Sequence, residues 1–282
     1  MDNLDCFSEI NREIMPELPE VEVFRQTFNS SALNQKVARV EVLDDIILEN
    51  ISSRAFQMKL KGATFQATHR HGKNLFVQLD TEETMMLHFG MSGSLKYGKD
   101  GEEEPEYSRI IFNLNNGYNL YYVSPRKLGR IGVVEDEADY IVENKLGPDT
   151  YSDDFTWDVF KNIMKGRRGI IKSSLMNQKL MAGIGNVYSD EILFHSNIYP
   201  FTVVYEINDK ELKTIFDNIK MVFEKVINTK LKGKKFPKNF LVLKRSEGAE
   251  CPICGGRIKR EKFSGRSSYY CEAHQKKNLG PN

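Results

Sequence analysis

Short runs of alternating apolar and polar residues fill the chain from Val37 to Val134. Gly, Asn, Asp and Ser separate these runs, and such residues end strands and form turns. One separator, Asn115-Asn116-Gly117, lies between two alternating runs, and Asn and Gly tolerate the positive φ angles that tight hairpin turns require. The pattern predicts an antiparallel β-sandwich or barrel over this stretch.

Helical spacing is found on both sides of the β-rich stretch. We predict a helix from Pro19 to Phe28, because a proline lies near its start and Glu20 and Glu22 lie in its first turn, where the macrodipole favours acids. After Leu146-Gly147-Pro148 the apolar period becomes helical. The segments with this period are 155–165, 187–196 and 209–231.

A change of pattern near residue 240 marks a third part of the chain. Glycines and lysines at 231–239 indicate a loop, and a small β-rich module that carries three cysteines begins at Phe240. We therefore predict an α+β fold. Its parts are an N-terminal helix and β-sandwich at 15–147, a helical domain at 148–239 and a metal-binding module at 240–282, with residues 1–14 as an extension.

Composition excludes several classes of protein. Of the 282 residues 40% are hydrophobic and 28% charged, and the net charge of +1 excludes disorder as the main state. No apolar run approaches the roughly 18 to 20 residues of a membrane span, and the first fourteen residues carry acids where a signal peptide carries lysines. We expect a cytoplasmic protein with no membrane contact.

The two halves of the chain carry opposite charge. Residues 1–150 hold 16 Lys and Arg against 25 Asp and Glu, a net charge of −9, whereas residues 151–282 hold 24 against 14, a net charge of +10. A basic half of this size favours a polyanionic partner such as nucleic acid. A dipolar protein with solvated charged faces is the alternative at this point.

Two ligand pairs in the last part of the chain predict a metal site. Cys251 and Cys254 form a CxxC pair, and after sixteen intervening residues Cys271 and His274 repeat the same spacing. Zn²⁺ accepts four such ligands in a tetrahedron, and a module this small has little core of its own. We predict one structural zinc ion; two reduced thiol pairs beside a surface histidine are the alternative.

A series of short motifs resembles the formamidopyrimidine-DNA glycosylases, the base-excision repair family that also includes endonuclease VIII. The resemblance extends from residue 15 to about 276. The motifs, in chain order, are Met15-Pro-Glu-Leu-Pro-Glu-Val-Glu, His71-Gly-Lys73, Leu87-His-Phe-Gly-Met91-Ser-Gly93, Pro125-Arg126-Lys-Leu-Gly129, Leu175-Met-Asn-Gln, Gly183-Ile-Gly-Asn186-Val-Tyr-Ser-Asp-Glu191 and Gly265-Arg266.

The resemblance implies a catalytic set at the start of the matching region. In the family the initiator methionine is removed and the exposed proline attacks C1′ of the damaged nucleotide, a place that Pro16 takes here. An α-amine suits this role, because its pKa near 7.7–8 leaves about a tenth or more of it neutral at pH 7. By the same resemblance Glu17 is the acid/base that assists sugar-ring opening, and Lys73 contacts a phosphate beside the lesion.

The resemblance also implies a set of DNA contacts. Met91 corresponds to the side chain that fills the gap left by a flipped nucleotide, and Arg126 faces the orphaned base. Asn186, at a glycine-rich helix start, and Arg266, on the zinc hairpin, match two phosphate contacts of the family. Taken alone, Met91 reads as a core residue of a strand, Lys73 as a surface lysine and the glycines as a tight turn.

The implied function is removal of oxidised purines, such as 8-oxoguanine and formamidopyrimidines, through an N-terminal proline Schiff base followed by β,δ-elimination. The partner is damaged double-stranded DNA, and we expect a monomer that associates with the nucleoid through DNA. Residues 1–14 are expected to be absent from the mature protein, since Pro16 needs a free amine. The alternatives are endonuclease VIII-like activity on oxidised pyrimidines and a non-catalytic DNA-binding relative that retains residues 1–14.

The chain departs from the family pattern at several positions. Lys127 and Leu128 replace an arginine and a phenylalanine, and Leu128 is a smaller wedge beside the orphaned base. Ser124 replaces an acid, and His274 replaces a final cysteine, which zinc tolerates. Residues 230–244 have only a weak likeness to the glycine- and threonine-rich loop that caps the flipped base in many relatives.

Overall fold

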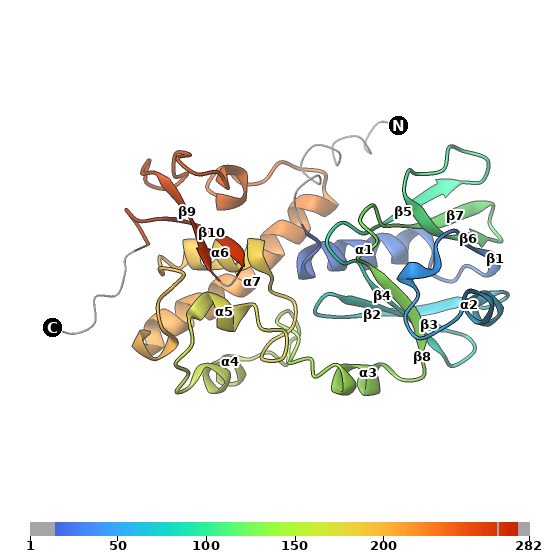
Figure 1. Cartoon of the computed structure of the whole chain (residues 1–282), viewed down its shortest axis with the longest axis horizontal. Coiled ribbons are helices and arrows are strands. Elements are labelled where there is room, and N and C mark those ends of the chain that lie inside the picture. Colours follow the sequence, from blue (N-terminus) through green and yellow to red (C-terminus); the bar gives the residue numbers. More distant parts are fainter. Residues whose placement is uncertain (1–14, 264, 276–282) are drawn as a thin grey trace. The chain divides into compact units, whose positions relative to one another are not determined.

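The computed structural model describes residues 15–263 and 265–275, and it divides between Asn144 and Lys145 into two compact units (Figure 1). Each unit is described by itself. Among the described residues, no helix combines the length and the apolar composition that a membrane crossing requires.

The first unit is a sandwich of two antiparallel four-stranded sheets, as the alternating pattern predicts. One sheet has the order β1-β6-β7-β5 and the other β2-β3-β4-β8. The strands of the first sheet are β1 (Val37–Val42), β5 (Ser94–Lys99), β6 (Ser108–Leu114) and β7 (Tyr118–Val123). The strands of the second are β2 (Phe65–His71), β3 (Asn74–Leu79), β4 (Thr84–His88) and β8 (Arg130–Val134).

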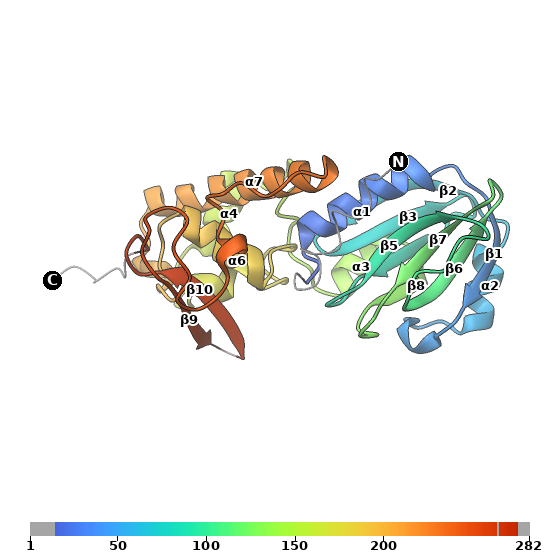
Figure 2. The same ribbon diagram turned by 90° about the horizontal axis from the view of Figure 1, so that it is seen from above.

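Aromatic side chains join the two sheets to helix α1 (Leu18–Ser31), which runs alongside the strands in Figure 2. The ring of Phe65, on β2, lies 6.1 Å from that of Phe112, on β6, and 5.0 Å from that of Phe28, on α1. All three rings are buried. Burying an aromatic side chain stabilises a fold by roughly 1.5–3 kcal/mol, so these contacts hold the helix and both sheets as one core.

Local signals explain most of the element boundaries in this unit. The predicted hairpin joins β6 to β7, with Gly117 at φ +79° and the Asn116 side chain accepting a hydrogen bond from the Tyr118 amide at 3.1 Å. Helix α1 ends three residues later than predicted, where the hydroxyls of Ser30 and Ser31 donate to the Thr27 carbonyl.

Two short helices of the first unit are absent from the sequence prediction. Helix α2 (Ser53–Leu60) lies between β1 and β2, and its N-cap Ser52 accepts a hydrogen bond from the Ala55 amide. Helix α3 (Glu137–Glu143) follows β8 and begins at Asp136, whose carboxylate accepts from two backbone amides. Helices of seven or eight residues carry too few periodic positions for the sequence pattern to reveal them.

The second unit is helical, with a β-hairpin near its end. Its helices are α4 (Trp157–Met164), α5 (Ile171–Leu175), α6 (Asn186–His195) and α7 (Asp209–Leu231), and the short 3-10 turns are η3 (Val204–Glu206) and η4 (Leu241–Lys244). Helix α7 has the predicted bounds because Asn208 and Glu211 form a capping box at its start. On α7, the ring centroid of Phe216 lies 5.7 Å from that of Phe160, and the ring centroid of Phe223 lies 6.0 Å from that of Tyr188.

The hairpin consists of β9 (Ile258–Phe263) and β10 (Arg266–Cys271) in antiparallel register, with Ile258 opposite Cys271. A small buried cluster supports it, made of Phe194, Leu241, Cys251, Ile258 and Cys271. A cluster of this size buries too little apolar surface to hold an independent module, which agrees with the prediction that a metal completes it.

Candidate active site and nucleic-acid interface

The start of helix α1 holds the predicted catalytic pair Pro16 and Glu17 in fixed geometry. Both residues are buried, and Glu17 has no exposed surface. The Glu17 amide donates to a Glu20 carboxylate oxygen at 3.0 Å, and the Glu17 side chain accepts from the Glu20 amide, which forms a capping box. The carboxylate that adjoins Pro16 therefore has one orientation, as a group that transfers a proton to or from a fixed atom requires.

A buried ion pair connects α1 to the β2–β3 turn, which carries Lys73. The Glu22 carboxylate accepts from the Arg70 Nε at 3.1 Å, and Arg70 Nη1 donates to the Gly72 carbonyl at 3.2 Å. Burial raises the pKa of Glu22, but hydrogen bonds from Arg25 and Gln26 and the charge of Arg70 outweigh it and leave the pKa below its usual value. This charged pair holds the turn with half-buried Lys73 against the helix that begins beside Pro16.

The imidazole of His88 organises the turn that follows β4. Its Nδ1 accepts a hydrogen bond from the Gly90 amide at 3.2 Å, which requires an unprotonated nitrogen. Burial, with the charges of Arg130 and Lys73, lowers the pKa of His88 to about 4. The turn that carries Met91 is thus held by a neutral histidine.

We expect His88 to make the unfolding free energy depend on pH. The unfolded chain has a histidine pKa near 6.5 and binds a proton that folded His88 refuses until about pH 4. Stability should therefore fall as the pH drops from 6.5 towards 4, by up to about 1.4 kcal/mol per pH unit. His88→Asn keeps an acceptor for Gly90 but does not titrate, so its stability, measured by urea unfolding at several pH values, should decline less steeply than that of wild type. Identical slopes would contradict this role of His88.

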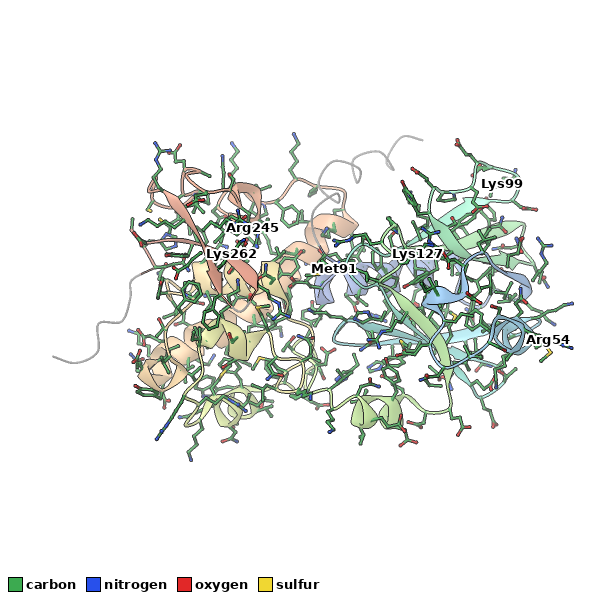
Figure 3. All side chains as sticks on the ribbon, in the orientation of Figure 1. Arg54, Met91, Lys99, Lys127, Arg245 and Lys262 are labelled. Carbon is green, nitrogen blue, oxygen red and sulfur yellow. The ribbon has the colours of Figure 1, made fainter. Side chains whose placement is uncertain are left out.

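Met91 and Leu128 are exposed at two turns that touch each other. Their side chains are 40% and 49% exposed, so the interpretation of Met91 as a core residue is wrong. Figure 3 labels Met91 among the side chains of the protein. Gly90 has φ +59°, and a Cβ placed there would lie 2.3 Å from the Leu128 carbonyl oxygen. Because Gly90 allows this approach, the Met91 turn and the Arg126–Gly129 turn form a single exposed ridge.

An ion pair missed by sequence reasoning holds the second turn. Lys127 adopts φ +52°, a left-handed conformation, and its ammonium lies 2.7 Å from a carboxylate oxygen of Asp44. The hydrogen bond from Lys127 lowers the pKa of Asp44. Arg109 lies 3.5 Å from the same carboxylate and donates to the Ser124 carbonyl at 2.9 Å. Lys127 thus pairs with Asp44 although it is exposed, and its neighbours Arg126 and Leu128 are exposed as well.

In the second unit, the glycine-rich segment before α6 is held by Gln178. Its amide nitrogen donates to the carbonyls of Met176 and Ile184, and its oxygen accepts from the Gly183 amide at 3.0 Å. Gly183 alone among the glycines of this motif has positive φ, at +118°. Helix α6 then begins at Asn186, whose buried Oδ1 has no hydrogen-bond partner among the described residues. Phosphate at a helix start is bound by N–H donors, which here are the backbone amides of the first turn of α6 and the Asn186 side-chain nitrogen.

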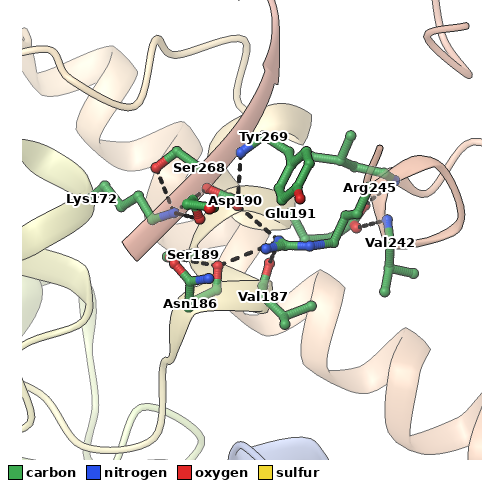
Figure 4. A network of polar contacts seen from close by, with 12 residues as sticks. Lys172, Asn186, Val187, Ser189, Asp190, Glu191, Val242, Arg245, Ser268 and Tyr269 are labelled. Atoms are coloured by element: carbon green, nitrogen blue, oxygen red, sulfur yellow. Dashed lines mark hydrogen bonds and ion pairs between the residues drawn. The ribbon is translucent and has the colours of Figure 1, made fainter. Parts of the chain in front are cut away.

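A buried polar network centred on Asp190 joins helix α6 to the hairpin (Figure 4). The Asp190 carboxylate lies 2.6 Å from the Lys172 ammonium and 2.8 Å from Arg245 Nη1, and it accepts from the Tyr269 amide at 3.1 Å. Lys172 also donates to the Ser268 hydroxyl at 2.7 Å. The network links the helix that presents Asn186 to the strand that begins at exposed Arg266.

Breaking this network should destabilise the second unit. Asp190→Asn leaves two cations facing a neutral amide, and removing one partner of a buried ion pair costs about 3–5 kcal/mol. We expect the second unit to unfold at a lower temperature, with weaker duplex binding. Calorimetry of the full chain tests this, with Asp217→Asn as control, since its pair with Lys213 is exposed on α7. Equal melting temperatures for wild type and Asp190→Asn would contradict the assigned role.

The four predicted zinc ligands converge. The ligand atoms of Cys251, Cys254, Cys271 and His274 all lie within 4.8 Å of one another. His274 Nε2 donates to the Phe194 carbonyl at 3.1 Å, so Nδ1, which lies 3.5 Å from Cys251 Sγ, keeps its lone pair for the metal. Three thiolates and one imidazole fit a tetrahedral structural Zn²⁺ with no open position, and the zinc prediction is confirmed.

Comparison with known proteins agrees with both units. Three family models match: the formamidopyrimidine-DNA glycosylase N-terminal domain at 15–131, the formamidopyrimidine-DNA glycosylase H2TH domain at 146–238, and the zinc finger found in FPG and IleRS at 248–273. A formamidopyrimidine-DNA glycosylase of Protochlamydia amoebophila is 32% identical over 278 residues, and one of Bacillus subtilis is 31% identical over 280. Each alignment covers 93% of this chain and 100% of the relative.

Solved structures share the fold. The Lactococcus lactis formamidopyrimidine-DNA glycosylase bound to abasic-site DNA has a TM-score of 0.83 at 24% identity, and the same enzyme with FAPY-dG DNA has 0.84 at 24%. Each likeness covers 93% of this chain and 100% of that chain. The β-sandwich, the helical unit and the zinc hairpin correspond to the three domains that the family models of this class of DNA glycosylases match. The chain belongs to the formamidopyrimidine-DNA glycosylase family, and the resemblance of its motifs is confirmed.

Proposed function

We propose that this protein removes oxidised purines, 8-oxoguanine and formamidopyrimidines, from double-stranded DNA and then cleaves the strand. The observation that carries the proposal is the buried capping box, which holds the Glu17 carboxylate next to Pro16. Relatives at 31–32% identity named formamidopyrimidine-DNA glycosylases support the assignment of substrate.

In the proposed reaction the secondary amine of Pro16 attacks C1′ of the damaged nucleotide. The glycosidic bond breaks and the base leaves with its electron pair, and it takes up the proton that the Pro16 nitrogen releases. Glu17 delivers a proton to the ring oxygen as the sugar ring opens. Loss of the ring oxygen from C1′ gives a cationic imine on Pro16, because proline nitrogen has no second proton to lose. Loss of a proton from C2′, with its bonding electrons drawn towards the imine, expels the 3′ phosphate, and loss of a proton from C4′ then expels the 5′ phosphate. Lys73 contacts the phosphate beside the lesion.

We further propose that a monomer holds the duplex through residues of both units. Asn186 and Arg266 contact phosphates, and Met91 and Arg126 fill the place of the flipped nucleotide, with Leu128 beside them. The exposure of Met91 and Leu128 on one ridge supports this, because a side chain that enters the base stack must lie at the protein surface before DNA binds. Extrusion of the nucleotide costs a few kcal/mol of stacking, which an apolar wedge partly replaces.

Oxidised pyrimidines are the alternative substrate class, and a comparison of base-release rates on the two kinds of lesion decides between them. We expect single-turnover base release from duplexes with 8-oxoguanine to exceed release from duplexes with an oxidised cytosine by at least about tenfold. The reverse order would assign the chain an endonuclease VIII-like activity and would contradict the proposed substrate.

The smaller wedge at Leu128 predicts loose discrimination of the base opposite the lesion. Stacking of an aromatic ring on a base is worth roughly 1–3 kcal/mol, and leucine provides little of it. Leu128→Phe should bind lesion duplex more tightly and widen the spread of excision rates among the four opposite bases. Leu128→Met, which is also aliphatic, serves as control. If Leu128→Phe and wild type give the same four rates, the side chain does not face the orphaned base.

A further inference from the structure

A long basic segment of the second unit lies outside the predicted catalytic, DNA-contact and zinc-binding residues. Residues 225–246 contain eight Lys and Arg and no Asp or Glu, between Glu224 and Glu247. The second half of the chain has a net charge of +10, so this one segment supplies most of its excess. Positive charge concentrated in one place produces a local potential that attracts polyanions.

The structure sorts the basic residues of this segment into anchored and exposed ones. Lys230 is buried over the ring of Phe236, and Arg245 contributes to the Asp190 network. The exposed lysines of the loop after α7 are Lys232, Lys234, Lys235 and Lys238. None of these four is paired with a carboxylate among the described residues. Four neighbouring unpaired cations repel one another, and this arrangement is stabilised when an anion binds.

The loop is fixed to helix α6. Phe236 and Phe240 are buried with ring centroids 6.2 Å apart, and Phe240 packs 4.9 Å from His195. Immediately after the loop, the Glu191 carboxylate accepts hydrogen bonds from the amides of Leu241 and Val242 at 2.9 and 2.7 Å. Glu191 is five residues from Asn186, about 7.5 Å along the helix axis. The end of the loop is therefore attached to the middle and the last turn of α6, the helix whose first residue is Asn186.

The composition of the loop favours a nucleic-acid backbone over a protein partner. Between Lys232 and Asn239 the exposed positions are lysine, glycine and asparagine, while Phe236 is buried. Protein interfaces are built around apolar and aromatic side chains and are poor in lysine. Regularly spaced phosphates need only cations on flexible stems.

We propose that Lys232, Lys234, Lys235 and Lys238 form a lysine surface that binds DNA phosphates in addition to Asn186 and Arg266. The inference rests on the proposed function, since it assumes that the α6 start meets duplex DNA. The lysine surface supplies affinity that is independent of the lesion and of base sequence, and it strengthens binding to undamaged duplex as much as to lesion duplex.

The test replaces all four lysines by glutamine in the protein that begins at Pro16 and measures duplex affinity by anisotropy at several salt concentrations. Each phosphate contact contributes about 0.9 to the slope of log affinity against log salt, so the slope should become shallower by roughly 3 to 4. Affinity for lesion and undamaged duplexes should fall by the same factor. The single-turnover rate of base release at saturating enzyme should not change, because the lysines do not touch the reacting atoms.

A matched control removes the same charge elsewhere. Lys36, Lys61, Lys96 and Lys99 are exposed lysines of the first unit, and their joint replacement by glutamine should leave the salt slope as in wild type. An equal change in both variants would mean that only net charge matters, which would overturn a local surface. An unchanged slope in the loop variant with base release intact would overturn it too, and would leave the loop to an acidic protein partner. If wild type releases no base, but the loop variant still has a shallower salt slope than wild type, the proposed function is contradicted and the lysine surface is not.

Discussion

Glu17→Gln is expected to lower the single-turnover rate of base release by about 10²- to 10⁴-fold, the range typical of general acid–base catalysis, while lesion-duplex affinity stays close to wild type. The glutamine side chain still offers an oxygen to the Glu20 amide, so the capping box at the start of α1 should persist. The Glu17→Gln variant lacks only the carboxylate that can take up and return a proton. Quenched-flow measurement of free base, with duplex affinity measured in parallel, separates chemistry from binding.

Glu20→Gln is the matched control. Glu20 is also buried in the first turn, and its side chain accepts from the Glu17 amide, which glutamine can do equally well. Base release by Glu20→Gln should remain near the wild-type rate. An equal loss in the two variants would assign the effect to the helix start rather than to proton transfer by Glu17.

Removal of zinc is expected to abolish the hairpin and with it most of the duplex affinity. Structural zinc sites contribute about 10–16 kcal/mol of apparent binding free energy, and the apolar cluster beneath this hairpin contains few residues. Cys271→Ser should lose zinc and should lose protection from hydrogen exchange at 251–275, while the β-sandwich keeps its protection. Metal analysis, hydrogen exchange and duplex affinity on one preparation measure all three.

A ligand exchange controls the zinc experiment. His274→Cys keeps four ligands and should retain one zinc ion per chain, because zinc accepts either residue. If Cys271→Ser binds zinc and duplex as wild type does, the four-ligand site is wrong.

The features that the sequence could predict are those encoded by neighbours along the chain. The alternation from Val37 to Val134 predicts the sandwich, and Asn115-Asn116-Gly117 predicts the β6–β7 hairpin. Helix 209–231 was predictable to the residue because a capping box begins it and loop residues follow it. The zinc ligands were also predictable, since both pairs have fixed local spacing.

The features that the sequence did not reveal depend on partners far apart in the chain. Asp44 holds Lys127 across more than eighty residues, and no local pattern connects them. Asp190 lies within a recognised motif, but its partners Lys172 and Arg245 come from other elements. Met91 shows a third case: its strand-like surroundings taken alone suggest a core residue, and only the motif resemblance predicts a side chain that reaches DNA. The chain turns at Gly90, and Met91 is exposed.

The central claim is that the amine of Pro16 forms the bond to the sugar, and borohydride trapping measures this most directly. Two proteins are compared, one that begins at Pro16 and one that retains residues 1–14, on duplex with 8-oxoguanine. Only an imine is reduced to a stable link, so we predict a covalent complex with the first protein, mapped by peptide mass to Pro16, and none with the second. Full base release by the longer protein, with its leader confirmed by intact mass and no link to Pro16, would contradict the account.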